Sequence, residues 1–205
     1  MTVRIAMQRL ETEGIIKKIQ GRGTFVAEPK FHDYVKGVRS LEETFAEQGI
    51  SVTNTLIGYE ITYPTQIWLK DLTLPEGSKA FKIRRLKKIG EEVLGLETRI
   101  FPLEVAERFA LEDLKSEPFI VLLRRNADTE VHRVVYRTRS SQLLEMEAEM
   151  MGIPEGSPAL VRAGVHYNRT DQPMMTGRVT FPAEKVELHF EVRKDQRIQE
   201  RLTLK

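Results

Sequence analysis

The stretch KAFKIRRLKKIGEEVLGLETRIF (Lys79–Phe101) contains two alternating segments joined by a short turn-forming sequence. Alternation of apolar and polar residues is typical of β-strands, and the glycine of Gly90–Glu92 suits a tight loop. We therefore expect an antiparallel hairpin with a three-residue loop, in which Ile89 pairs with Val93. Because side chains alternate between the two sides of a strand, one face carries Phe81, Ile83, Arg85, Lys87 and Ile89.

The expected register brings charged side chains together in the middle of the hairpin. The predicted pairs are Arg85–Glu97, Lys87–Gly95 and Ile83–Arg99. A carboxylate beside an arginine orients the guanidinium, and a glycine beside a lysine leaves room for a bound group. Arginine and lysine both bind phosphate and carboxylate groups, so this face is a candidate site for a small anionic ligand. A salt bridge at the rim of the sheet gives the same pattern, and the sequence leaves both interpretations open.

The segments on either side of this hairpin predict further strands and several short helices. Strands are expected at residues 51–62, 130–139, 158–168, 174–181 and 185–192. Helices are expected at residues 40–49, 65–69, 103–114, 119–124 and 142–151. Long strands joined by tight turns, such as the one at Thr170–Gln172, predict an antiparallel sheet with helices packed on it. The expected fold class is therefore α+β.

The first residues of the chain predict an amphipathic helix at residues 2–13. Its apolar stripe consists of Val3, Ala6, Met7 and Leu10, and Gly14 is suited to end the helix. The opposite face carries Arg4 and Gln8, whose side chains can reach base edges in the major groove of DNA. A solvated helix face has the same composition, so this helix alone does not decide between the two.

A basic hairpin is expected directly after this helix, at residues 15–26. Its loop at Gln20–Gly23 is rich in glycine, and Lys17, Lys18 and Arg22 cluster around it. A helix followed by a hairpin with a basic tip is typical of a winged helix. In that arrangement Arg22 enters a minor groove and the two lysines lie near phosphates.

The stretch TVRIAMQRLETEGIIKKIQGRGTFV (Thr2–Val26) closely resembles the second half of the DNA-binding domain of GntR-family bacterial repressors. The resemblance implies that Arg4 reads a base, while Thr2 and the hairpin residues contact the DNA backbone. Such domains have two further helices before the recognition helix, and one residue stands there in this chain. Residues 1–28 are therefore expected to be a partial winged helix-turn-helix domain.

The remainder resembles the effector-sensing UTRA domain of the HutC branch of the same family, which shares the chorismate-lyase fold. The matching motifs are LKDLTLPEGSKAFKIRRLK (69–87), LETRIFP (96–102) and MMGIPEGSPALVRAGVHYNRTDQP (150–173). In UTRA sensors of phosphorylated amino sugars, an R-x-R strand and the glutamate of its return strand line the effector pocket. Arg85, Lys87 and Glu97 fall at those positions, with lysine in place of the second arginine.

Other positions depart from these sensors. Glu117–Phe119, Pro173–Met175 and residues 183–190 differ from the usual motifs, so recognition of an amino sugar is not carried over. The expected effector is a small anion such as a phosphorylated sugar or a carboxylate. Tyr167 matches a tyrosine near the family's pocket, although a strand tyrosine more often packs in a core. The candidate effector-binding residues are Arg85, Lys87, Glu97, Arg99 and Tyr167.

The two resemblances divide the chain into segments. We expect a partial DNA-binding domain at 1–28, a linker at 29–36, an effector-binding and dimerisation domain at 37–193 and a tail at 194–205. The expected partners are operator DNA, a small anionic effector and a second copy of the chain, because two-fold symmetric repressors read two half-sites. The candidate DNA-binding residues are Thr2, Arg4, Gln8, Lys17, Lys18 and Arg22.

Composition narrows the functional classes. The 205 residues contain no cysteine, which excludes disulfides and thiolate metal sites and fits the cytoplasm. No apolar run approaches the roughly 18 residues of a membrane span. His32, His132, His166 and His189 are scattered without metal-ligand spacing, and we expect no cofactor or metal. A ligand-binding or dimerisation module without DNA binding is the alternative to a repressor, and a lyase-like enzyme is a third class that lacks a catalytic constellation.

Overall fold

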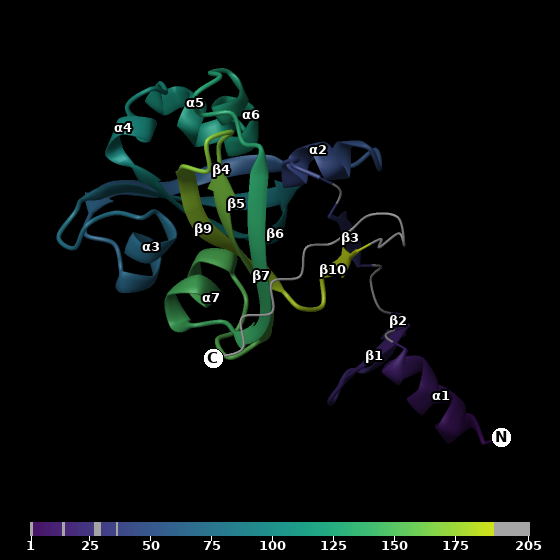
Figure 1. Ribbon diagram of the computed structural model, residues 1–205. Coiled ribbons are helices and arrows are strands. Elements are labelled where there is room, and N and C mark those ends of the chain that lie inside the picture. The colour runs from purple at the N-terminus through teal and green to yellow at the C-terminus, as the bar shows by residue number, and fades with distance from the viewer. Residues whose placement is uncertain (1, 14, 27–29, 36, 191–205) are drawn as a thin grey trace, which may run out of the picture.

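The computed structural model describes residues 2–13, 15–26, 30–35 and 37–190. Its centre is a six-stranded sheet in which every neighbouring pair of strands is antiparallel (Figure 1). From one edge to the other, the strands are β4 (Thr53–Thr62), β5 (Ala80–Ile89), β6 (Glu92–Pro102), β9 (Pro173–Pro182), β8 (Pro158–Tyr167) and β7 (Arg133–Gln142). Short helices pack on this sheet, which confirms the predicted α+β fold.

The hairpin of β5 and β6 has the predicted central register but a different loop. The observed pairs include Arg85–Glu97, Lys87–Gly95 and Ile83–Arg99. The expected pairing of Ile89 with Val93 is wrong, because Ile89 pairs with Glu92. Gly90, with a φ of 58°, begins a two-residue loop. A β-bulge opposite Lys87 and Lys88 takes up the extra residue of β6, Leu94, so the shorter loop and the bulge offset each other.

Helices cover both faces of the sheet (Figure 1). One face is covered by α2 (Leu41–Ala46), α4 (Leu103–Ala106), α5 (Leu111–Ser116) and α6 (Phe119–Arg124). The other is covered by α3 (Gln66–Asp71) and α7 (Glu145–Met151). The first face holds two separate apolar clusters. Ile83 of β5 belongs to the cluster under α4, α5 and α6, whereas Ile89 packs against the cluster under α2. The charged residues Arg85 and Lys87 lie between them.

Two predicted helices have different bounds. Residues 103–114 form two helices, α4 and α5, because the chain turns between them and Phe109 packs against the core. Gln142 was expected to begin a helix, but it ends β7, where it pairs with Pro158 of β8. The pairing between β7 and β8 therefore extends three residues beyond the strand predicted at 130–139, and α7 begins later, at Glu145.

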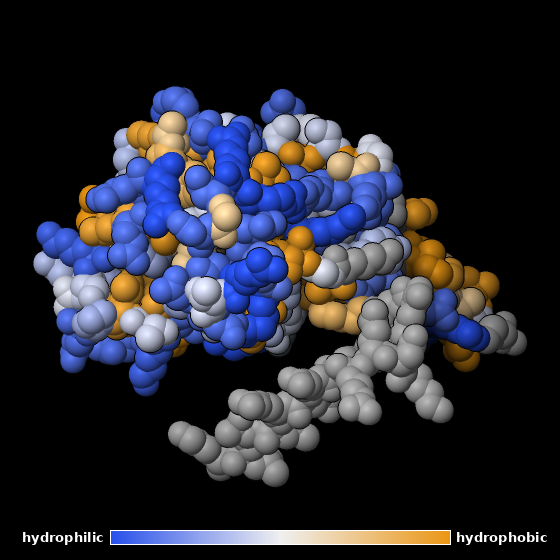
Figure 2. Space-filling model, turned by 45° about the horizontal axis from the view of Figure 1, so that its top comes forward, coloured by the Kyte–Doolittle hydropathy of each residue, from blue (hydrophilic) through white to orange (hydrophobic). Residues whose placement is uncertain are grey.

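The N-terminal residues form the predicted helix and hairpin. The helix α1 (Val3–Thr12) is followed by β1 (Ile16–Ile19) and β2 (Gly23–Val26), which pair antiparallel. We call α1, β1 and β2 the N-terminal unit. No residue of α1 is buried, and Val3 is 80% exposed. Figure 2 shows exposed hydrophobic surface on the N-terminal unit, at the right of the view.

A second small sheet lies beside the main one. The strand β3 (Phe31–Tyr34) pairs parallel with β10 (Val186–His189), so part of the segment expected to be a linker is a strand. Residues 27–29 and 36 of that segment, and 191–205 after β10, lie outside the described residues. In the described part of the chain, no helix is long and apolar enough to cross a bilayer.

Candidate functional site

A hollow that is partly open to solvent lies between the two apolar clusters of the first face. Apolar wall residues come from α6 and β9, and Ser40 and α2 form part of the rim. Charged and aromatic side chains around it come from four strands of the sheet, β5, β6, β7 and β8. Those used below are Lys87, Glu97, Arg99, Tyr136, Arg162 and His166.

Glu97 is the centre of the charged groups around the hollow. Its Oε2 accepts hydrogen bonds from Arg85 Nη2 at 2.6 Å and Nε at 3.2 Å, and Lys87 Nζ lies 3.2 Å away. Its Oε1 accepts from Arg99 Nε at 3.1 Å. Burial opposes ionisation of this carboxyl, but the charges of Lys87, Arg85 and Arg99 outweigh it and hold the pKa of Glu97 well below its usual range. Glu97 is therefore a carboxylate shared by three cations.

Arg85 lies behind Glu97 and does not line the hollow. Its side chain is 0% exposed. Besides Glu97, it donates Nη1 hydrogen bonds to the backbone carbonyls of Leu114 at 3.2 Å and Glu117 at 2.7 Å. Its guanidinium carbon lies 3.6 Å from the ring centroid of Phe119. These contacts join the sheet to the end of α5 and the start of α6, so Arg85 positions the carboxylate and holds the fold.

Lys87 lines the hollow and connects three elements. Its Nζ donates hydrogen bonds to Glu42 of α2 and, at 3.0 Å, to Asn54 Oδ1 of β4. Burial opposes ionisation of Glu42, but the charge of Lys87 outweighs it and lowers the pKa of this carboxyl. With the contact to Glu97, the ammonium already has three partners. A ligand in the hollow gains from its charge, but a new hydrogen bond to it displaces one of these partners.

Two side chains at the hollow have buried atoms without partners. Among the residues that the structure describes, three buried side-chain atoms lack a hydrogen bond: Arg99 Nη1, His166 Nδ1 and Arg178 Nε. The first two belong to residues that line the hollow, whereas Arg178 contacts Glu147 of α7 on the other face. Buried donors and acceptors are normally paired, so a water or a ligand group in the hollow is the partner that these two atoms require.

His166 is a neutral acceptor in this setting. Burial lowers the pKa of His166 well below its usual value, and the nearby charges of Arg99 and Arg162 lower it further. The ring also makes a hydrogen bond to the backbone of Met175. With its proton on the nitrogen used there, the imidazole presents the lone pair of Nδ1. The hollow therefore offers both an arginine donor and an imidazole acceptor.

Arg162 and Tyr136 complete the site on β8 and β7. Arg162 Nη1 donates to the carboxylate of Asp33 in β3, and its guanidinium carbon lies 5.0 Å from the Tyr136 ring centroid. A Cβ on Gly164 would lie 3.0 Å from two carbons of the Tyr136 ring, so the glycine allows this ring to lie across β8. Burial raises the pKa of Asp33 more than Arg162 lowers it.

The predicted effector-binding residues are only partly brought together. Lys87, Glu97 and Arg99 line the hollow, whereas Arg85 lies behind it and Tyr167 lies outside it. The ring of Tyr167 contacts Arg133, whose guanidinium carbon is 3.9 Å from its centroid. The room expected beside Gly95 is filled, because a Cβ there would lie 2.9 Å from a ring carbon of Phe181.

Three residues of the site were missed from the sequence. They are Tyr136, Arg162 and His166. In PALVRAGVHY (158–167), Arg162 and His166 share one face of the strand with Leu160 and Gly164. This is the signal that identified Arg85 and Lys87, and the same argument applied to β8 would have found two of the three.

The predicted DNA-binding residues lie on the N-terminal unit. Thr2 precedes α1 as its N-cap residue, and Thr2, Arg4, Gln8 and Arg22 are exposed. Lys18 Nζ donates to Glu11 of α1 at 2.6 Å, which joins the hairpin to the helix. The side chain of Lys17 lies outside the part of the chain that the structure describes.

The comparisons with known proteins agree with this fold. A family model of the UTRA domain matches residues 47–187, which include every strand of the main sheet. The chain belongs to the UTRA domain family. The HTH-type transcriptional repressor NagR of Bacillus subtilis (strain 168) is 28% identical over 161 residues, which are 78% of this chain and 66% of the repressor. The histidine utilization repressor of Klebsiella aerogenes is 28% identical over 113 residues, 55% of this chain and 47% of that protein.

Solved structures show the same UTRA fold. PhnF from Mycobacterium smegmatis superposes with a TM-score of 0.72 at 20% identity, covering 94% of this chain and 84% of that chain. Its effector domain alone gives a TM-score of 0.69 at 16% identity, with 80% of this chain and 99% of that domain covered. The chain spans just under two thirds of the length of NagR. The curated relatives are transcriptional regulators, and the sequence motifs indicated the same GntR-family, HutC-type class.

Proposed function

We propose that this chain belongs to a ligand-responsive transcriptional repressor whose UTRA domain binds a small anionic metabolite and thereby controls operator binding. The observation that carries the proposal is the hollow at Glu97, where a buried arginine donor and a buried imidazole acceptor lack partners. The relatives support it, since those named above are transcriptional repressors.

The charges around the hollow favour an anion. In the described part of the chain, four cations of this cluster, Arg85, Lys87, Arg99 and Arg162, face three carboxylates, Asp33, Glu42 and Glu97. The cluster therefore has one positive charge in excess, which favours an anionic group. Low dielectric around these groups strengthens such a contact. Arg99 Nη1 is the donor for the anionic group, and His166 Nδ1 accepts from a hydroxyl of the same ligand. A phosphorylated sugar or a hydroxy acid carries both groups.

The contact between Arg162 and Asp33 gives a physical route to the DNA-binding residues. Asp33 lies in β3, only a few residues after the N-terminal unit. A ligand anion that attracts Arg162 competes with Asp33 for the guanidinium. The position of β3 then depends on whether the hollow is filled, and the orientation of the N-terminal unit follows. The coupling is reciprocal, so operator DNA changes ligand affinity by the same factor.

We further propose that the domain forms a homodimer through the β4 edge of the sheet. Ile57, Tyr59, Ile61 and Tyr63 repeat at every second position of this edge and are 39% to 66% exposed. An edge strand with an apolar stripe is a template for pairing with a second copy. A dimer mass for the wild-type chain in light scattering at tens of micromolar, with a monomer mass for Ile61→Glu, is the expected result. A monomeric wild type at that concentration contradicts this interface.

The anion site is tested by calorimetric titration with inorganic phosphate. Arg99→Gln removes the unpaired donor, and we expect phosphate affinity to fall by about 10- to 100-fold, as for the loss of one charge-assisted hydrogen bond. Arg178→Gln is the matched control, because Arg178 is on the same sheet, also has an unpaired nitrogen and faces α7. Its affinity should equal that of the wild type. Equal affinity of all three proteins would place the anion outside the hollow.

A further inference from the structure

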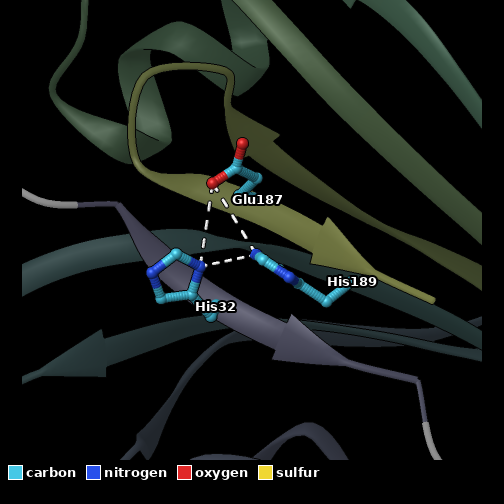
Figure 3. Close-up of side chains that lie close together, drawn as sticks. All are labelled: His32, Glu187 and His189. Atoms are coloured by element: carbon cyan, nitrogen blue, oxygen red, sulfur yellow. Dashed lines mark hydrogen bonds and ion pairs between the residues drawn. The ribbon is translucent and has the colours of Figure 1, made fainter. Parts of the chain in front are cut away.

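Two histidines and a glutamate lie together on the outer face of the small parallel sheet. His32 of β3 pairs with Glu187 of β10, and His189 lies two residues beyond Glu187 on the same strand. The three side chains therefore share one face, while Asp33 and Leu188 between them point toward the protein. Figure 3 shows the two imidazoles and the carboxylate directed toward one another.

The three ligand atoms are close enough to hold one ion. His32 Nδ1 lies 2.7 Å from His189 Nε2, and Glu187 Oε2 is 3.7 Å from each of these nitrogens. Bonds of about 2.0–2.1 Å with tetrahedral angles place ligand atoms roughly 3.3 Å apart. The two distances to Glu187 are longer than this value by about 0.4 Å, and the distance between the histidines is shorter by about 0.6 Å. Modest side-chain rotations therefore bring all three atoms into place.

We propose that His32, Glu187 and His189 form a Zn²⁺ site. Two imidazole nitrogens and one carboxylate are a ligand set typical of zinc, and the parallel pairing holds them on adjacent strands. The side chains are 42%, 52% and 39% exposed, so the ion has a path from solvent and a water can fill the fourth position. A hydrogen bond between the two histidines explains their contact with each other. It does not explain why Glu187 lies close to both rings.

The site connects two parts of the chain that are far apart in sequence, and one of them follows the N-terminal unit. His32 and His189 are 157 residues apart in sequence, and β3 follows the N-terminal unit. On the opposite side of the same strand, Asp33 bonds to Arg162 at the hollow. A bound zinc therefore fastens β3 to the end of the sheet domain next to the residues through which the hollow contacts this strand. Binding only to the folded chain also stabilises it.

The test is calorimetric titration of tag-free protein with Zn²⁺ in a buffer without chelating components. We expect one equivalent to bind to the wild type. His189→Ala should weaken binding by at least about 100-fold, since even indirect partners of a metal ligand contribute about 10- to 100-fold. His132→Ala is the matched control, because His132 lies 3.6 Å from one glutamate, Glu130, without a second histidine in that pair. It should bind zinc like the wild type.

The ligand geometry is checked with Co²⁺, whose visible absorption should appear in the wild type and in His132→Ala and disappear in His189→Ala. Glu187→Gln, at the most exposed of the three positions, provides a second variant if His189→Ala does not fold, and it should also lose affinity. Zinc affinity unchanged in both His189→Ala and Glu187→Gln, or no binding to the wild type, would overturn the proposal.

Discussion

The helix α1 of the N-terminal unit and the helices of the sheet domain differ in burial. The stripe of α1 leaves none of its ten residues buried, whereas α6, with six residues, buries Phe119, Ile120, Leu122 and Leu123. A helix gains stability mainly from packing of its apolar face, not from the pattern itself. The contrast teaches that the motif proposed for DNA recognition and the source of stability are separate in this chain. Most of its stability must come from the sheet domain.

The largest difference in stability between the two regions is expected when one arginine in each is replaced by methionine. Arg85→Met removes one of the three cations that hold the buried Glu97 and leaves the carbonyls of Leu114 and Glu117 without their Arg85 donor, which should lower the unfolding free energy by about 3–5 kcal/mol. Arg4→Met, at an exposed position of α1, should change it by less than about 0.5 kcal/mol. Urea denaturation measures both. Similar losses in the two variants would mean that the N-terminal unit contributes to the same cooperative core.

A smaller contrast is expected from apolar truncations. Leu123→Ala removes a side chain that is 0% exposed and should destabilise the chain by about 2–5 kcal/mol. Val3→Ala, at a position that is 80% exposed, should leave the unfolding free energy within about 0.5 kcal/mol of the wild type. Thermal denaturation provides the measurement. A clear loss for Val3→Ala would show that the stripe of α1 is covered in solution.

The smallest effect is the pH dependence that His166 brings to the sheet domain. Its pKa is lowered in the folded state, so the unfolded chain takes up a proton first as the pH falls below the ordinary value of 6.5. The associated stability is present above that pH and should fall by about 1.4 kcal/mol per pH unit until the folded group titrates. Urea unfolding between pH 7 and 5.5 measures this slope, which His166→Gln should remove and His132→Gln should retain. Equal slopes in all three proteins would contradict a buried neutral imidazole.

The sequence predicted the sheet well where the determinants are local. Alternation and a short glycine loop predicted the central pairs of β5 and β6 correctly. The predicted loop was one residue too long, and a bulge opposite Lys88 restores the register. The helix expected at residues 40–49 forms as α2, and its start has both capping hydrogen bonds between Ser40 and Glu43. By contrast, the break between α4 and α5 follows from how Phe109 packs, which sequence periodicity does not report.

The candidate site was predictable in part for the same reason. Lys87, Glu97 and Arg99 were found because they lie on one local hairpin. Arg85 is buried by contacts with α5 and α6, whereas Arg99 keeps an unpaired donor. The rules of strand pairing do not specify these contacts. His32 and His189 meet only through the parallel pairing of strands 157 residues apart, and no spacing rule connects them.

The most direct test of the central claim is the position of a heavy anion in crystals of the protein. After a soak in tungstate, a phosphate-like anion, we expect an anomalous tungsten peak in the hollow, with an oxygen about 2.7–3.2 Å from Arg99 Nη1. The peak should be absent from crystals of Arg99→Gln and present in those of Arg178→Gln. An empty hollow in the wild type, with tungsten bound only to the exposed arginines of the N-terminal unit, would contradict the assignment of this hollow as the effector site.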